Sequence, residues 1–194
     1  MVRPREFDEA HVVEQAMTVF WQKGYEGTSV QDLVEATGLQ RGSLYGAFGD
    51  KHSLFLVALR TYIDFTLARF DAMLAEADNP VDAIREFVRQ GGNDCAHPIT
   101  GAHGCMLGNT INELAAHDPQ ARKMAADGAG RMQRRIADAL RSAQASGRFD
   151  VERDPDAVAT FIQCGLQGLI LLAKARPGDD VIQGVVGEIL RTLD

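Results

Sequence analysis

The segment 40–45 concentrates side chains that can donate hydrogen bonds to phosphates and to the edges of bases. An arginine such as Arg41 can bind guanine through two hydrogen bonds, and a glutamine such as Gln40 can pair with adenine. The hydroxyls of Ser43 and Tyr45 are of the type that holds phosphates in place. Gly42 lies among them and would let a helix backbone sit close to DNA. These residue types predict a surface that reads double-stranded DNA.

Two short helices joined at Gly38 must position this surface. Thr28 and Ser29 can cap the first amides of a helix that starts near residue 28, and Asp32 is placed to complete a capping box. Gly38 tolerates the positive φ of a helix end, and the chain turns there. In the next helix Leu44 and Phe48 are expected to face inward. The residues that then point outward are Gln40, Arg41, Ser43 and Tyr45.

Residues 7–59 resemble the DNA-binding domain of the TetR family of one-component transcriptional regulators. The matching residues are Phe20, Gly24, Tyr25, Thr28, Ser29, Gly38, Gly42, Ser43, Leu44, Tyr45, Phe48 and Lys51. The resemblance implies that Lys51 holds a phosphate and that DNA is contacted by Thr28, Gln40, Arg41, Gly42, Ser43 and Tyr45. Where many members carry a second aromatic residue or a histidine, this chain has Gly46 and Ala47, so we expect weaker or redistributed phosphate contacts. The alternative is a helical hairpin that serves packing alone.

The charge of the chain limits how DNA can be bound. The net charge is −7, and residues 1–60 carry six basic against eight acidic residues. Binding must then depend on a few local positive groups and on helix N-termini, with a strong dependence on salt. Arg3 and Arg5 belong either to a short arm that reaches the neighbouring groove or to a solubilising tail.

The hydrophobic periodicity predicts an all-α protein with two domains. Residues 1–50 form the helix-turn-helix domain, and residues 51–194 form a larger helical domain for effector binding and dimerisation. Besides the two short helices we expect helices over 8–24, 50–77, 80–91, 119–146, 154–175 and 179–193. The most apolar stretch, residues 168–173, is much shorter than a membrane span, which predicts a cytoplasmic protein.

The last two helices have small or apolar residues along one side. These are Cys164, Gly165, Gly168, Leu169 and Leu172 in the first, and Val181, Val185, Ile189 and Leu193 in the second. Periodicity alone fits a four-helix dimer interface and a cover for the subunit's own core equally well. The resemblance favours a homodimer that binds a palindromic operator.

The middle of the chain holds residue types that line mostly apolar pockets with a few orienting polar groups. We expect an effector pocket among Phe65, Phe70, Phe87, Met106, Asn109, Thr110, Phe161, Gln163 and Gln167. The same types are common in ordinary core, and the sequence does not separate residues that line a pocket from those that fill one.

The cysteines suggest two further kinds of site. Cys95, His97, His103 and Cys105 could bind zinc or copper if the Gly- and Pro-containing loop between them folds both ends onto one ion, although their spacing is not a standard one. Alternatively Cys105, at a helix start, could sense oxidants or electrophiles with Lys174 stabilising its thiolate, as the resemblance implies for a subgroup of these regulators. Otherwise Cys105 is a small buried residue.

We therefore expect a ligand-responsive transcriptional regulator, favoured as a repressor, that is released from its operator by a small-molecule effector. The alternative within this fold is regulation through Cys105 or a metal. The alternative of another class is a helical enzyme or protein-interaction module that does not bind DNA. Phosphate-binding glycine loops and nucleophile motifs are absent from the sequence, so we expect neither catalytic residues nor a cofactor.

Overall fold

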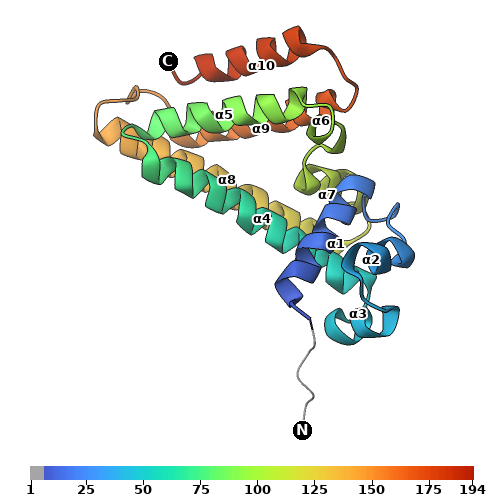
Figure 1. Ribbon diagram of the computed structural model, residues 1–194. Coiled ribbons are helices and arrows are strands. Elements are labelled where there is room, and N and C mark those ends of the chain that lie inside the picture. The colour runs from blue at the N-terminus through green and yellow to red at the C-terminus, as the bar shows by residue number, and fades with distance from the viewer. Residues whose placement is uncertain (1–6) are drawn as a thin grey trace.

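Helices form the regular structure over residues 7–194, the part of the chain that this computed structural model describes (Figure 1). The all-α prediction is confirmed. In chain order the helices are α1 Glu9–Lys23, α2 Val30–Thr37, α3 Arg41–Phe48, α4 Lys51–Glu76, α5 Pro80–Ala96, α6 Thr100–His103, α7 Met106–Leu114, α8 Pro119–Ala145, α9 Pro155–Ala173 and α10 Asp179–Arg191. Arg3 and Arg5 lie outside the described residues.

Short polar side chains determine where most of these helices begin. Asp8, Ser29, Asp50, Asn79, Asp118 and Asp154 each accept hydrogen bonds from amides in the first turn of the helix that follows. Proline occupies the first turn of α5, α8 and α9, where its missing N–H costs nothing. The predicted helix starts therefore agree closely with the observed ones.

The segment 92–118 differs from the prediction. α5 does not stop at Gly91 but continues to Ala96, and α6 occupies part of the expected loop. Gly92 is a packing residue, since a Cβ atom built there would lie 2.5 Å from Cγ2 of Val186 in α10. Gly92 thus lets α10 approach α5, and a Cβ atom built at Gly91 would lie 3.1 Å from Cδ2 of Leu166 in α9. The predicted helix start at Cys105 is confirmed, because Cys105 is the N-cap of α7.

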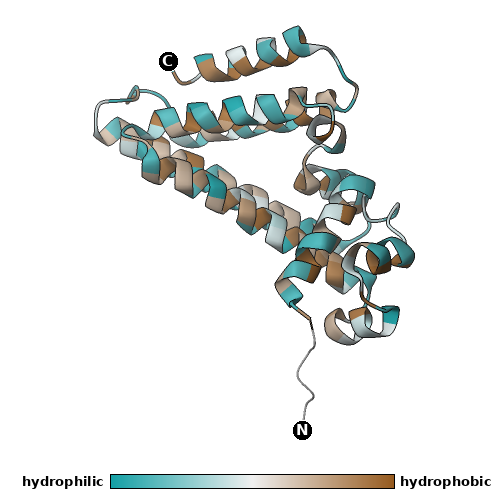
Figure 2. Cartoon of the chain, in the orientation of Figure 1, coloured by the Kyte–Doolittle hydropathy of each residue, from teal (hydrophilic) through white to brown (hydrophobic). Residues whose placement is uncertain are grey.

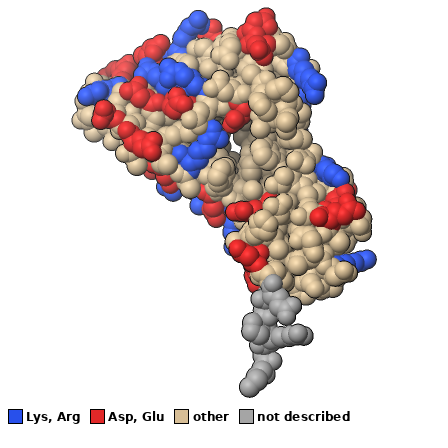
Figure 3. All heavy atoms as spheres, in the orientation of Figure 1, with Lys and Arg blue, Asp and Glu red and all other residues tan. Residues whose placement is uncertain are grey.

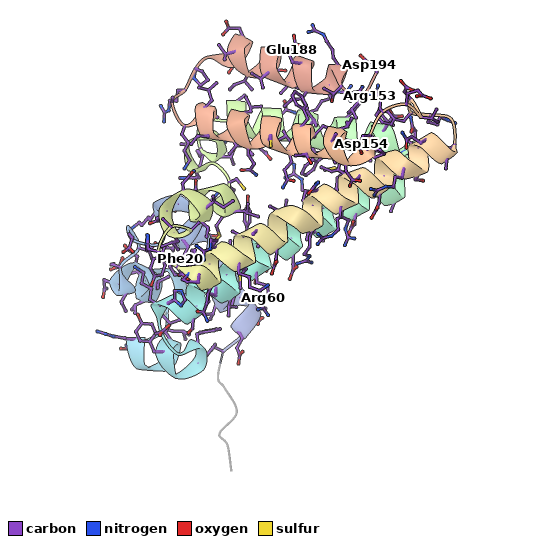
Figure 4. The ribbon with its side chains drawn as sticks, turned by 180° about the vertical axis from the view of Figure 1, so that it is seen from behind. Phe20, Arg60, Arg153, Asp154, Glu188 and Asp194 are labelled. Atoms are coloured by element: carbon purple, nitrogen blue, oxygen red, sulfur yellow. The ribbon has the colours of Figure 1, made fainter. Side chains whose placement is uncertain are left out.

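Two long helices, α4 and α8, run side by side through the molecule and join its two ends (Figure 1). The cluster of α1, α2 and α3 lies at one end, and α5, α9 and α10 form a layer over the other. Apolar residues are concentrated where the helices face one another (Figure 2). At the far end Arg153 bridges the start of α9 to the end of α10, where its guanidinium donates to the Thr192 carbonyl at 2.6 Å (Figure 4).

The N-terminal helices share a core with the start of α4. Phe20 of α1 is buried, and its ring meets that of Phe55 edge to face with centroids 5.2 Å apart (Figure 4). Leu33 of α2 and Leu44 of α3 are fully buried in the same core. The first turns of α4 therefore pack as part of the helix-turn-helix unit.

The exposed apolar surface of α9 differs in part from the predicted interface. Leu169, Ile189 and Leu193 are buried within the subunit, whereas the exposed positions of the last two helices include Phe161, Cys164, Gly168, Leu171, Leu172 and Val181. By length and composition alone α9 meets the criteria for a membrane span, with 33% of its apolar window buried, and the core helix of a soluble protein meets the same criteria. Here α9 packs on α5, α8 and α10.

Close packing between α4 and α8 generates a prediction about stability. A Cβ atom at Gly128 would lie 2.7 Å from Cδ1 of Ile63, so we expect Gly128→Ala to lower the free energy of unfolding by about 1–3 kcal/mol. Gly130→Ala is the matched control, because a Cβ there meets only the flexible end of Arg134. Urea denaturation of both variants checks this, and equal stability would contradict it.

Candidate nucleic-acid interface and ligand cavity

Helix α3 presents the predicted DNA-reading residues together. Gln40, Arg41, Gly42 and Ser43 are exposed, and Tyr45 is half-buried beneath the Arg41 guanidinium, which lies 5.7 Å above the ring centroid. Leu44 anchors the other side of the helix in the core. Gln40, at the N-cap, makes no side-chain hydrogen bond to the first amides of α3. One short helix and its N-cap thus carry all five residues, and their contact with DNA stays a prediction.

Thr28 does not share this surface. It is 1% exposed, and its hydroxyl donates to the Gly24 carbonyl at 2.6 Å. The expectation that its side chain contacts DNA is corrected, because that side chain holds the α1–α2 turn together. The neighbouring Ser29 is exposed and caps α2.

The start of α2 is held by a capping box that also reaches α1. Ser29 and Asp32 exchange hydrogen bonds, and the Lys23 ammonium donates to the Asp32 carboxylate at 2.5 Å. The hydrogen bond from Lys23, with those from the Ser29 amide and hydroxyl, lowers the pKa of Asp32 to about 2. The carboxylate is therefore ionised near neutral pH, and α2 moves with the end of α1.

Lys51 opens α4 next to this unit. Its ammonium lies 4.4 Å from the centroid of the Tyr25 ring, a cation–π contact that fixes where the charge sits. Asp50, one residue earlier, caps the helix by accepting from the Ser53 amide at 2.7 Å. On the face shown in Figure 3 acidic and basic residues are interspersed, and no broad basic patch is seen on this face of the described N-terminal helices.

The glycines of α3 are not required by internal packing. A Cβ atom built at Gly42 or at Gly46 would meet no atom within 4 Å. Glycine in a helix costs about 0.5–1 kcal/mol relative to alanine. The space above Gly42 is therefore open for an outside molecule to approach the backbone.

A cavity of ≈ 300 Å³ lies between α1, α4, α5, the α6–α7 junction, α8 and α9. Of the predicted effector residues, Phe65, Phe87, Gln163 and Gln167 line it. Phe70, Met106 and Thr110 are buried in the core instead, and Phe161 is 54% exposed on the outside of α9. Asn109 borders a separate, smaller hollow together with Lys174. The cavity therefore takes four of the nine predicted positions, and one of the four, Phe65, lies at its edge with 62% of the residue exposed.

Several lining residues could not be predicted, because they come from segments far apart in the chain. They include Met17 and Trp21 of α1, Tyr62 and Arg69 of α4, and Asp94 of α5. Arg69 and Asp94 are the charged side chains among the described lining residues, and they pair at 3.4 Å. Gln90 also accepts from the Arg69 guanidinium, at 2.6 and 3.0 Å. The cavity is therefore apolar with one internally balanced charge pair.

Cys105 lies at the boundary of the two hollows. Its Sγ accepts a hydrogen bond from Nε2 of Gln167 at 3.7 Å, and its thiol interacts with the Tyr62 hydroxyl, whose pKa is raised by burial and by this neighbour. Lys174 borders the same hollow but its ammonium donates to Oδ1 of Asn109. Lys174 thus lines the same hollow as Cys105, and its ammonium already has a hydrogen-bond partner in Asn109.

The other sulfur and imidazole groups do not assemble around Cys105. Cys95 is buried, and burial together with the charge of Asp94 raises the pKa of its thiol to about 11. Among residues 7–194 no three His, Cys, Asp or Glu side chains come together in a way that could hold a metal ion. The proposed set of Cys95, His97, His103 and Cys105 is therefore not assembled.

Polar contacts with three acceptor residues, Gly104, Glu113 and Asp118, tie α1, the turn after it and the start of α4 to the segment between α6 and α8. Nε1 of Trp21 donates to the Gly104 carbonyl at 2.7 Å. The Glu113 carboxylate of α7 accepts from the backbone amides of Tyr25 and Glu26, at 2.9 and 2.7 Å. Nε2 of His52 lies 2.6 Å from the Asp118 carboxylate at the start of α8.

Comparison with known proteins gives consistent matches along the chain. A family model described as bacterial regulatory proteins, tetR family, matches residues 12–58, and one described as tetracyclin repressor-like, C-terminal domain, matches residues 80–186. The uncharacterized HTH-type transcriptional regulator YezE of Bacillus subtilis strain 168 is 32% identical over 195 residues, which cover 100% of both chains. The HTH-type transcriptional repressor ComR of Escherichia coli K12 is 30% identical over 97% of this chain and 90% of its own.

A solved structure extends the likeness to a complex. It contains a cysteine mutant of the TetR family transcriptional regulator CifR with 26-bp double-strand operator DNA, and it matches with a TM-score of 0.84 at 28% identity. The match covers 99% of this chain and 100% of that chain.

The open space above Gly42 generates a prediction about DNA binding. We expect Gly42→Ala to keep or raise thermal stability while it weakens binding to a duplex by about 1–3 kcal/mol, since the added methyl group meets only DNA. Gly46→Ala is the matched control, because the N-terminal part of a recognition helix makes most contacts to base edges. Thermal unfolding and fluorescence anisotropy check this. A loss of affinity that is equal in both variants would contradict it.

Proposed function

The chain belongs to the TetR family of transcriptional regulators, and we propose that it is a repressor that binds a palindromic operator as a homodimer and is released by a small neutral molecule. The observation that carries this proposal is the exposed α3 surface, whose polar side chains are presented by a helix anchored through Leu44. The match to a regulator bound to operator DNA supports the same use of the helix. Such a protein acts in the cytoplasm, where the DNA is.

We propose that α3 enters the major groove with Arg41 and Gln40 at base edges. Ser43, Tyr45 and Lys51 hold phosphates, and Gly42 allows close approach of the backbone. Since the chain is acidic overall, with a net charge of −7, few cations supply the attraction and each carries a large share of the affinity.

The homodimer is proposed from the exposed apolar residues of α9 and α10. Phe161 is 54%, Leu171 57% and Leu172 42% exposed, although each is large and apolar. Contiguous apolar surface of this kind marks interaction sites in soluble proteins. Two copies that bury it around a twofold axis would present two α3 helices to the two halves of a palindrome.

The effector is proposed to be small, neutral and largely apolar. The cavity is lined by aromatic and aliphatic side chains, and its charges, Arg69 and Asp94, already pair with each other. A charged ligand would lose hydration there without gaining an unpaired partner. Binding that favours a conformation with altered α4 tilt would change the spacing of the two α3 helices and lower operator affinity.

Selection of bound duplexes from a random pool tests the regulator proposal, and we expect a palindrome. Arg41→Ala should then weaken binding to that duplex by about 1–3 kcal/mol and relax preference at one base position in each half. Arg148→Ala, an exposed arginine in the distant α8–α9 connection, is the control and should bind as the parent protein does. Recovery of no palindrome would refute the proposal.

A second candidate is an effector that reacts with Cys105 rather than binding reversibly. The supporting observation is that Cys105 is half-buried and borders the cavity beside Tyr62 and Gln167. We expect that alkylation by iodoacetamide lowers operator affinity in the parent protein and leaves Cys105→Ser unaffected, measured by anisotropy at each extent of modification. If Cys105→Ser loses as much affinity, another cysteine is responsible and this candidate fails.

A further inference from the structure

The cavity has a wall that belongs to the DNA-reading end of the molecule. Met17 and Trp21 of α1 line it, although the other lining residues come from α4 and later helices. Trp21 is the single tryptophan of the chain. A molecule in the cavity would therefore touch α1 directly, as well as α4.

Trp21 also contacts residues of α4 and of the α6–α7 junction. Its indole N–H donates to the Gly104 carbonyl at 2.7 Å, and its ring lies 5.8 Å from that of Tyr62 and 6.2 Å from that of His103. The hydrogen bond is partly buried, where a lost partner is costly. The position of the indole is therefore set jointly by α1, α4 and the α6–α7 junction.

The junction lies close to the end of α9. Gly104 has φ 68°, and a Cβ atom built there would lie 2.5 Å from Cε of Lys174, the residue that follows α9. Because Trp21 belongs to α1, an occupant that displaces the indole acts on α1 directly.

Movement of α1 is passed to the reading surface through short contacts. Thr28 donates to the carbonyl of Gly24 at 2.6 Å, and Lys23 pairs with Asp32 at 2.5 Å, so the end of α1 is bound to α2. α2 in turn packs against α3.

We propose that Trp21 transmits occupancy of the cavity to the DNA-binding helices. An occupant lies on the indole and offers an oxygen acceptor to its N–H, which releases the Gly104 carbonyl and shifts α1. The class of ligand is a flat neutral molecule that carries a carbonyl or ether oxygen. This inference rests on the proposed function of the cavity as the effector site. It adds a second route for the signal, through α1, besides the proposed change in the tilt of α4.

A tethered occupant tests the inference without knowledge of the natural effector. In a Cys95→Ala, Cys164→Ser background, Cys105 is the one thiol left of three. Monobromobimane is a flat neutral dicarbonyl; the Cys105 thiolate displaces its bromide and fixes it at the cavity by a thioether. The label is introduced into this background, into its Trp21→Phe variant and into its Met17→Leu variant, the matched control from the same wall.

We expect indole quenching to make the bimane emission at least about twofold weaker in the background and in Met17→Leu than in Trp21→Phe. Labelling should lower operator affinity by about tenfold or more in the first two proteins and by less than about threefold in Trp21→Phe. Unlabelled, the background and Met17→Leu should bind the operator alike, and the effect of labelling in each protein is measured against the affinity of the same protein without label. Thermal unfolding checks each fold, and Trp21→Leu replaces Trp21→Phe if the latter does not fold.

Three results overturn the inference, and they can be told apart. Equal emission in all three labelled proteins means that the occupant does not meet Trp21. An equal fall of affinity in Trp21→Phe means that the signal passes elsewhere, while the cavity keeps its proposed function. No fall in any labelled protein means that the cavity is not the effector site, so the proposed function of the cavity fails as well.

Discussion

Helices α2 and α3 are eight residues long each, which is too short for either to be stable alone in water. Their order depends on burial of Leu33 and Leu44 in the core that Phe20 and Phe55 build between α1 and α4. The orientation of the reading surface is therefore set by the helices on which it packs. Whatever moves α1 or α4 moves α3, and this dependence is what makes regulation from a distance possible.

The polar contacts made by Gly104, Glu113 and Asp118 connect the reading end to one particular segment of the rest of the molecule. Glu113 and Gly104 both accept N–H groups of α1 or of the turn after it, and Asp118 meets His52 on α4. All three acceptors lie in the segment between α6 and the start of α8. That segment borders the cavity at Gly104 and Cys105. The segment that supplies these three acceptors is therefore in direct contact with the cavity at Gly104.

The helix-turn-helix could be predicted because its signals are local: a capping box at Ser29 and Asp32, and a left-handed Gly38 with φ 67°. Most of the failures have non-local causes. Thr28 is the exception, because its buried hydroxyl donates to the nearby Gly24 carbonyl, whereas the exposed Ser29 caps α2. Gly92 breaks no helix because it admits Val186 from a distant helix. The cavity unites α1 with helices up to α9, and periodicity within one helix does not reveal which side faces a void rather than a neighbour.

The N-terminus of α3 is left open by its own sequence. Gln40 supplies no side-chain acceptor, whereas the helices before and after it are capped by Ser29 and Asp50. The first-turn amides of α3 thus lack a side-chain cap within the protein. A phosphate oxygen would complete the cap, so binding to the operator would also stabilise the first turn of α3. Hydrogen exchange in that turn would then be rapid in the free protein and slow on DNA, and part of the binding free energy would be spent on ordering the helix that reads the sequence.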